Sequence, residues 1–407
     1  MKVALKKWGW RLLRVAVIAA ALFYVIWNVH WHDFATLADG KTTVRAYGQS
    51  EDGTRILADF DNDGTPEEHA AKEFSRPKSK DPKQVLPIVV PGLRTVLHET
   101  RWGYVVVALA IFAPNYVFMA WRLRLLLRTQ GVYLRRRDAV KVSYASAFLN
   151  FAVPTGSTGG DIYKAWYVAA HATGRRTEAV TVVLLDRAIG LINFIIMAAI
   201  VSLLSWMSGR VGVLGGFVAT AFTVSILAGC AFFSQRVRKL IRIDSWLPKL
   251  KFGDHLVRID RTAFSLRGHP DTLARAFMWT IIVQTVVCVD AMILARGVGM
   301  QVDLVFGHVL DFFLAVIVGL TVSALPGNPP QGFGVLEGIM AHILTPHYGD
   351  WPHIFAVCMG VRLLHLAWSL PGALVLLIEP RPKPPTTEEA PASDHPAVVD
   401  AVATTEA

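Results

Sequence analysis

Apolar runs recur along nearly the whole chain and are separated by shorter polar segments. A hydrocarbon core of about 30 Å is crossed by about 20 helical residues at ~1.5 Å each. The runs predicted to span a membrane are Val15–Val29, Tyr104–Trp121, Val180–Trp206, Val211–Phe233, Ala276–Ala295, Leu304–Leu325 and Ile354–Ile378. The pattern therefore predicts an all-α polytopic membrane protein with about seven spanning helices.

Two apolar stretches are interrupted by glycine- and proline-rich breaks. Ala139–Ala172 breaks at Val153–Gly160, and basic residues that indicate the cytoplasmic side flank it at both ends. Leu304–Leu344 breaks at Leu325–Gly334, and its flanks indicate the opposite side. A helix break persists at membrane depth only where its backbone groups line a protein cavity. We therefore predict two re-entrant hairpins that enter the membrane from opposite sides.

Composition and charge support a membrane location. Hydrophobic residues make up 53% of the chain, charged residues make up 18%, and the mean hydropathy is +0.41, which excludes an ordinary soluble protein. The net charge of +10 does not indicate nucleic acid, because the basic residues lie in blocks between apolar runs. These blocks predict a bacterial inner-membrane protein with both termini in the cytoplasm. The three cysteines lie in three different runs, which predicts no disulfide or metal site.

The segments between the runs predict four regions. These are a membrane anchor at 1–30, an extracytoplasmic insertion at 31–101, a transmembrane domain at 102–379 and a disordered cytoplasmic tail at 380–407. Within the insertion, Thr43–Tyr47 and Arg55–Phe60 alternate around Asp52–Gly53, which predicts a small β-hairpin. Gly92–Trp102 is predicted to form a short amphipathic helix.

An acidic motif in the insertion leaves two interpretations open. Asp59, Asp61 and Asp63 precede Gly64 at the alternating positions of a calcium loop. Position twelve of such a loop requires a bidentate Glu, but Ala70 stands there. The motif is either a calcium loop or, as the missing ligand favours, a solvated acidic turn. We expect no cofactor elsewhere in the chain.

Charged residues within the apolar stretches have matched positions in two halves of the chain. Asp161 follows the first break and precedes Arg187 by 26 residues, while Glu337 follows the second break and precedes Arg362 by 25 residues. Charged residues inside a membrane are rare and usually functional. The spacing predicts an inverted-topology repeat, as in many transporters, with these four residues around a shared cavity near the midplane.

The helix that follows each break is expected to bind an anionic group. Its first N–H groups are free and carry about half a positive charge, an arrangement that binds phosphate. Asp186 and Arg187 project about 100° apart and cannot simply pair, so Lys164 and Glu337 are the expected partners. We expect Arg187 and Lys164 to bind a lipid phosphate. The predicted substrate-binding residues are Gly159, Gly160, Asp161, Lys164, Asp186, Arg187, Gly334, Glu337 and Arg362.

Three stretches carry a family resemblance. They are Asn150–Ala165 (NFAVPTGSTGGDIYKA), Leu184–Gly190 (LLDRAIG) and Ser323–Gly338 (SALPGNPPQGFGVLEG). They resemble the flippase-like transmembrane family typified by the membrane domain of lysylphosphatidylglycerol synthetases. The resemblance matches Asp161, Asp186, Arg187 and Glu337 to recurring polar residues of that family, whereas Lys164 replaces its usual arginine.

The resemblance implies a lipid translocase and not an enzyme. Its substrate would be an anionic or aminoacylated phospholipid, or a polyprenyl-phosphate-linked lipid, that moves between leaflets. One alternative is a membrane glycosyltransferase, for which Asp33 is the available acid near the first span. Another is a scaffold that recruits cell-envelope enzymes through residues 31–101. The expected partner is a membrane lipid with an anionic headgroup, and the sequence names neither the lipid nor a coupling ion.

Overall fold

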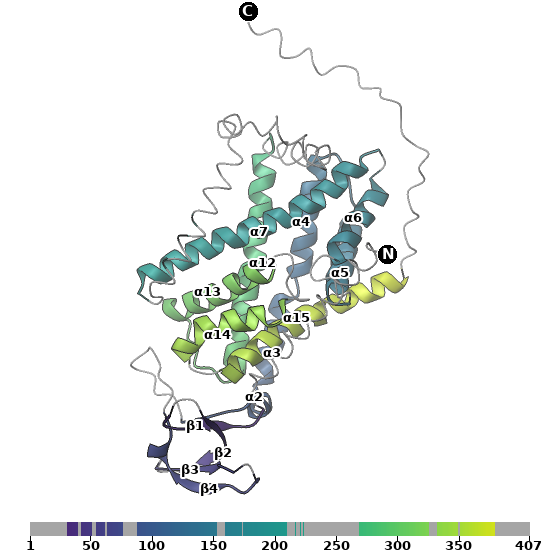
Figure 1. The fold of residues 1–407 in the computed structure, drawn as a ribbon. Coiled ribbons are helices and arrows are strands. Elements are labelled where there is room, and N and C mark those ends of the chain that lie inside the picture. The colour runs from purple at the N-terminus through teal and green to yellow at the C-terminus, as the bar shows by residue number, and fades with distance from the viewer. Residues whose placement is uncertain are drawn as a thin grey trace, which may run out of the picture.

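The computed structural model consists of a helical part with a small β-sheet at one end (Figure 1). It describes residues 31–39, 42–50, 54–61, 63–75, 88–152, 159–172, 174–209, 268–324, 332–348 and 351–378, together with the isolated positions 216, 220 and 223. The expected anchor at 1–30, nearly all of the run Val211–Phe233 and the expected tail at 380–407 lie outside these residues.

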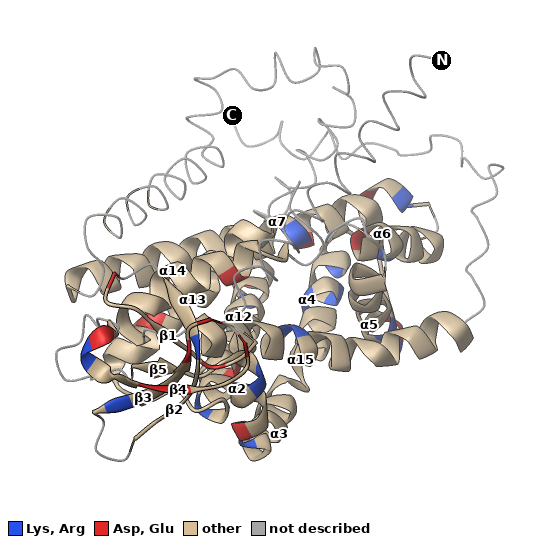
Figure 2. Ribbon diagram, turned by 60° about the horizontal axis from the view of Figure 1, so that its bottom comes forward, with Lys and Arg blue, Asp and Glu red and all other residues tan. Residues whose placement is uncertain are grey.

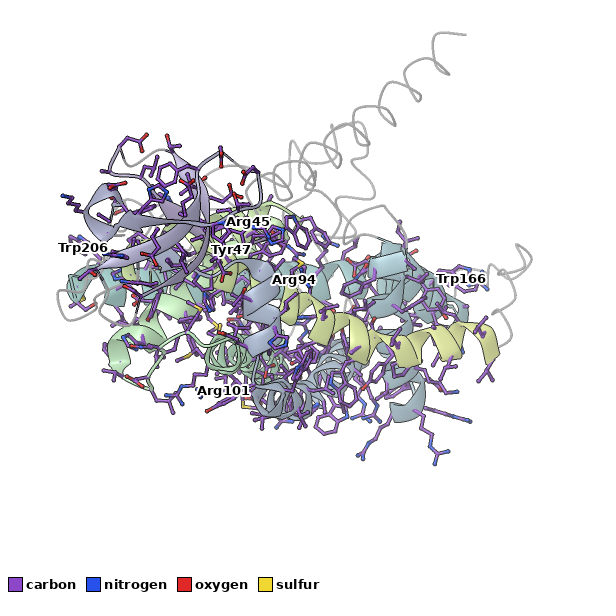
Figure 3. All side chains as sticks on the ribbon, turned by 90° about the horizontal axis from the view of Figure 1, so that it is seen from below. Arg45, Tyr47, Arg94, Arg101, Trp166 and Trp206 are labelled. Atoms are coloured by element: carbon purple, nitrogen blue, oxygen red, sulfur yellow. The ribbon has the colours of Figure 1, made fainter. Side chains whose placement is uncertain are left out.

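The sheet has five antiparallel strands in the order β4-β3-β2-β1-β5. The strands are β1 (Phe34–Thr36), β2 (Thr43–Gln49), β3 (Arg55–Asp59), β4 (Glu67–Ala70) and β5 (Val89–Val90). The predicted hairpin is confirmed, since β2 pairs with β3 and Ala46 lies opposite Ala58, both of them buried. Because side chains alternate along a strand, Arg45 and Tyr47 lie on the opposite face, with the guanidinium 4.9 Å from the ring centroid (Figure 3).

The Asp33 carboxylate, directly before β1, contacts the start of the first helix after the sheet. Helix α2 (Leu93–Glu99) corresponds to the short helix predicted after Gly92. The Asp33 carboxylate accepts hydrogen bonds from the Gly92 N–H at 2.7 Å and from the Thr95 hydroxyl at 2.6 Å. The side chain therefore satisfies donors at the start of the helix that have no partner within it.

The helices that follow are long and apolar. They are α3 (Trp102–Phe112), α4 (Asn115–Thr129), α5 (Arg136–Ala152), α6 (Gly159–His171), α7 (Arg176–Met207), α12 (Pro270–Gly297), α13 (Phe306–Ser323), α14 (Val335–Tyr348) and α15 (Trp351–Ile378). Five helical segments, with α3 and α4 counted as one, are long and apolar enough to cross a membrane. They match five of the seven predicted spans, and the remaining two lie outside the described ranges.

The outer surface of the helical part is suited to lipid. Large apolar side chains such as Val106, Leu363 and Leu374 are more than half exposed. Charged positions are few along the helix ribbons (Figure 2). A surface of this kind is stable in a hydrocarbon core and unfavourable in water. The chain is therefore a multi-pass membrane protein.

Two helix pairs stand where the interrupted stretches were predicted. Helix α5 packs against α6, and α13 packs against α14, with the tips of both breaks outside the described residues. Glycines allow backbones to approach closely at these contacts. A Cβ added at Gly160 of α6 would lie 2.0 Å from the Ser146 carbonyl oxygen of α5, and one at Gly372 of α15 would lie 2.1 Å from the Tyr144 carbonyl oxygen.

We predict that Gly372→Ala destabilises the protein although it improves helix propensity. The added methyl group would force α15 away from α5, and such overpacking costs ~1–3 kcal/mol, which exceeds the roughly 1 kcal/mol gained from alanine. The matched control is Gly338→Ala in α14, where an added Cβ meets nothing within 4 Å. Thermal unfolding of detergent-purified protein measures both, and equal stability of the two variants would contradict the packing.

Candidate functional site

A cavity of about 320 Å³ lies between the helices. Its walls come from α4, α5, α6, α7 and α12, with single residues from α13, α15 and their flanks. The charged residues that line it are Arg122, Asp161, Lys164, Asp186 and Arg187. Four of these five are residues that the sequence predicted to bind substrate.

The centre of the cavity wall is the buried carboxylate of Asp186 on α7. Arg122 of α4 donates from Nε to Asp186 Oδ1 at 2.7 Å, and Lys164 of α6 places Nζ 3.7 Å from Oδ2. Arg122 also donates from Nη1 to the Thr280 hydroxyl of α12 at 2.9 Å. All three charged side chains are less than a tenth exposed. This triad connects three helices, and Thr280 adds a fourth. The contact confirms Lys164 as a partner of Asp186.

A second ion pair on the cavity wall is more accessible. Arg187 of α7 donates from Nη1 to Asp161 Oδ2 of α6, and the two side chains are 32% and 24% exposed. The expected pairing of Arg187 with Glu337 is therefore wrong, because Asp161 takes that place. Asp161 lies in the first turn of α6, directly after the first break.

The corresponding ion pair of the other half, Glu337–Arg362, is buried. Arg362 of α15 donates to both Glu337 oxygens, at 2.9 and 3.0 Å, and Glu337 also accepts the Gly334 N–H at 2.8 Å. Arg362 further bonds the Gly332 carbonyl oxygen, and its guanidinium lies 4.1 Å from the centroid of the Phe333 ring. Glu337 has no exposed surface.

Of the two pairs expected to share a cavity, one lines this cavity among the described residues. Asp161 and Arg187 line the cavity, whereas Glu337 and Arg362 do not. The two pairs nevertheless have matched positions, since each acid lies in the first turn of the helix after a break and each arginine lies on the next long helix. The pairing of residues 26 and 25 apart agrees with the spacing in the sequence.

The predicted glycines are not on the cavity wall. Gly160 donates its N–H to the Asn150 side-chain oxygen at 2.8 Å and packs on Ser146, so it fixes the start of α6. Gly334 has a positive φ of 81° and bonds Glu337. Gly159, Gly160 and Gly334 are not among the residues that line the cavity.

The sequence prediction missed several polar residues of the wall. Arg122 begins a block of basic residues of the kind that marks a cytoplasmic flank, yet its side chain is buried against Asp186. One signal was available: Asn115 and Arg122 are seven residues apart, about two helical turns, so they share a face. Three buried polar atoms on the wall have no hydrogen-bond partner within the described residues: Asn115 Oδ1, Ser143 Oγ and Gln284 Oε1.

Two acidic features lie away from the cavity. Asp290 of α12 is buried, and neither carboxylate oxygen has a partner within the part of the chain described. In the sheet, the carboxylates of Asp59, Asp61 and Asp63 each place an oxygen within 4.8 Å of the others. Hydrogen bonds from Thr65, the side-chain bond first, lower the pKa of Asp63. The carboxylates thus converge as a calcium loop requires, and Ala70 still provides no twelfth-position ligand.

Comparison with known proteins identifies a family. The family model described as "Lysylphosphatidylglycerol synthase TM region" matches residues 89–371. The match includes the five charged residues of the cavity wall and the Glu337–Arg362 pair. No curated protein matches the chain.

We predict that Asp186→Asn strongly destabilises the protein, because it leaves Arg122 and Lys164 buried without a counter-charge. Breaking a buried ion pair from one side costs ~3–5 kcal/mol. Adding Lys164→Met to this variant should recover part of the loss by removing one of the two cations. Asp161→Asn, at the more exposed Asp161–Arg187 pair, should cost about 1 kcal/mol or less. Thermal unfolding in detergent compares the variants, and equal losses for the two aspartates would contradict the difference in burial.

Proposed function

Because the chain belongs to the lysylphosphatidylglycerol synthase TM region family, we propose that it is a lipid translocase. Its substrate is an anionic or aminoacylated phospholipid, or a polyprenyl-phosphate-linked lipid, and it moves this lipid between the leaflets. The observation that carries the proposal is the charged cavity between candidate membrane spans. Charges are expensive at such a depth, and their presence indicates a polar substrate.

Arg187 is the residue that receives the phosphate. Among the three cations on the wall it is the most accessible, since its side chain is 32% exposed and those of Arg122 and Lys164 are each 7% exposed. A guanidinium binds phosphate through two parallel hydrogen bonds. In the absence of lipid Asp161 neutralises Arg187, and the arriving phosphate competes with this carboxylate. Lys164 contributes positive charge from behind, through the Asp186 triad.

In this mechanism the Asp161–Arg187 pair and the Glu337–Arg362 pair are accessible in turn. The Asp161–Arg187 pair lines an open cavity, while the equivalent Glu337–Arg362 pair is closed by Gly334, Gly332 and Phe333. We propose that α5–α6 and α13–α14 are re-entrant hairpins of an inverted repeat and that the second pair opens when the first closes. The matched positions of the two pairs support this proposal.

The proposed orientation follows the distribution of basic residues. Arg124, Arg128 and Arg135–Arg137 lie in and between α4 and α5, so this end faces the cytoplasm of an inner membrane. The sheet then lies on the outer side, and both chain termini lie inside. A lipid headgroup in the inner leaflet would reach Arg187 from the cytoplasmic end.

The glycosyltransferase alternative loses its main support. Its candidate acid, Asp33, is engaged by Gly92 and Thr95 at the start of α2. A carboxylate that holds two donors in a structural cap is poorly placed to act on a sugar donor. The Asp33 contact is therefore structural in our proposal.

We predict that Arg187→Gln abolishes transport and that Arg187→Lys weakens it, while both proteins accumulate normally. A charge-assisted hydrogen bond contributes ~1.5–3 kcal/mol, so loss of the charge lowers the rate by about tenfold or more. Lysine keeps the charge and loses the two-point contact. The measurement is dithionite quenching of NBD-labelled phospholipid in proteoliposomes with a fixed protein content.

Arg362→Gln is the matched control from the other half. It leaves Glu337 buried without its main partner, so it should lower accumulation and thermal stability more than Arg187→Gln does. The site assignment is wrong if Arg187→Gln is lost from the membrane and the second change Asp161→Asn restores it. That result would make the Asp161–Arg187 pair a structural contact.

A further inference from the structure

We infer that the cavity selects a phosphodiester with a single negative charge and an uncharged, hydroxyl-bearing headgroup, in preference to an aminoacylated one. The inference rests on the proposed function and narrows its substrate class. It follows from the charges on the wall and from the buried atoms that have no partner there.

The charge of the wall sets the charge of the occupant. The described residues that line the cavity carry three cations, Arg122, Lys164 and Arg187, and two carboxylates, Asp161 and Asp186. With His365 neutral, one positive charge is not balanced within the wall. Buried charges are strongly disfavoured unless they are compensated, so the best occupant carries one negative charge.

This balance separates the headgroups of the proposed substrate class. A phosphodiester carries one negative charge, whereas a phosphomonoester carries about 1.5 to 2 at pH 7. A zwitterionic lipid adds an ammonium to the phosphodiester and leaves the wall's positive charge uncompensated. A lysyl ester adds two amino groups, both largely protonated at neutral pH, and so increases the excess of positive charge.

The atoms without partners lie at two levels of the cavity. Helices α3–α4 and α12 run antiparallel, because Arg101 N–H bonds Gly297 O near one end and Arg122 bonds Thr280 further along. Asn115 and Gln284 therefore both lie on the Gly297 side of the Arg122–Thr280 contact, about 10 Å from Arg122 and about 6 Å from Thr280 along their helix axes. Ser143 lies instead beside Lys164, since α5 and α6 form a pair whose contact begins at Ser146 and Gly160.

Each level suits one part of a polyol lipid. The Ser143 hydroxyl can donate to a phosphate oxygen near Lys164 and Arg187. The Gln284 amide is held by a hydrogen bond from Nε2 to the Gly190 carbonyl oxygen at 3.4 Å, which leaves Oε1 as an acceptor without a donor. Asn115 Oδ1 is a second such acceptor. Hydroxyl groups satisfy these acceptors without adding charge.

The test is competition for binding to the full-length protein in detergent micelles. NBD-labelled phosphatidylglycerol is displaced by unlabelled phosphatidylglycerol, phosphatidylinositol, phosphatidylethanolamine, lysylphosphatidylglycerol or phosphatidic acid. The two polyol lipids should compete about tenfold better than the other three, as expected when unmatched charge or unsatisfied buried acceptors penalise the others. Equal competition by lysylphosphatidylglycerol would overturn the inference.

A substitution that adds one negative charge to the cavity wall tests the same charge balance. Gln284→Glu makes the wall neutral, so it should weaken phosphatidylglycerol binding about tenfold and improve the relative binding of phosphatidylethanolamine. Asn115→Asp, on another helix, should give the same reversal and guards against a folding defect of the first variant. Retention of the wild-type order by both variants, once they are shown to be folded, would overturn the inference.

A failure of the headgroup assignment can be distinguished from a failure of the proposed translocase function. Selective binding without dithionite-detected movement in proteoliposomes would overturn the translocase and leave the headgroup assignment intact. Movement of all five lipids at one rate, with equal binding, would overturn the headgroup assignment and leave the translocase proposal intact.

Discussion

The buried Asp186 carboxylate is the constraint on which the arrangement of the helical part depends. An ionised carboxylate between apolar helices is stable only with cations and hydrogen-bond donors around it. Arg122 and Lys164 supply them from two helices, and Thr280 holds the second arm of Arg122 from a third. The cavity lies beside this triad, and α4, α6, α7 and α12 each contribute residues to its wall.

The two halves differ in how completely their acids are satisfied. Glu337 receives three donor contacts and has no exposed surface, while Asp161 shares a partly exposed bond with Arg187. The same spacing therefore gives a closed site in one half and an accessible site in the other. A transition between two such arrangements exchanges discrete packing states, as alternating-access transporters do. The proposed inverted repeat, in which one pair opens as the other closes, requires an asymmetry of this kind.

The sequence predicted those features that depend on local pattern. Apolar runs predicted five candidate spans that the described residues contain, and alternation predicted the β2–β3 hairpin. The similar spacing of 26 and 25 residues predicted that acid and arginine correspond in the two halves. Partner choice was not predictable in the same way. Helical periodicity gives the height and face of Arg187, but the neighbour on that face depends on how α6 and α7 pack, and this placed Asp161 there and not Glu337.

Arg122 and Asp33 are two further residues whose partners could not be predicted from the local sequence. An arginine at the end of an apolar run has the same local pattern whether it marks a membrane flank or turns inward, and only the tertiary contact with Asp186 separates the two. Asp33 near the first span has the pattern of an exposed acid, yet its partners lie 59 and 62 residues away in the chain. Interactions across such distances are set by the fold and not by neighbouring residues.

The register of α12 finally relates the sheet to the cavity. Gly297, at the sheet end of α12, is 17 residues from Thr280, about 26 Å along the helix axis, whereas Thr280 is only about 15 Å from Pro270. The charged level of the cavity thus lies toward the helix end that is remote from the sheet. In the proposed mechanism, a headgroup that enters from the Pro270 end reaches Arg122 and Arg187 without passing the sheet. The charged residues of the cavity wall therefore lie on helices, and the Asp33 contact joins the sheet end of the protein to these helices through α2.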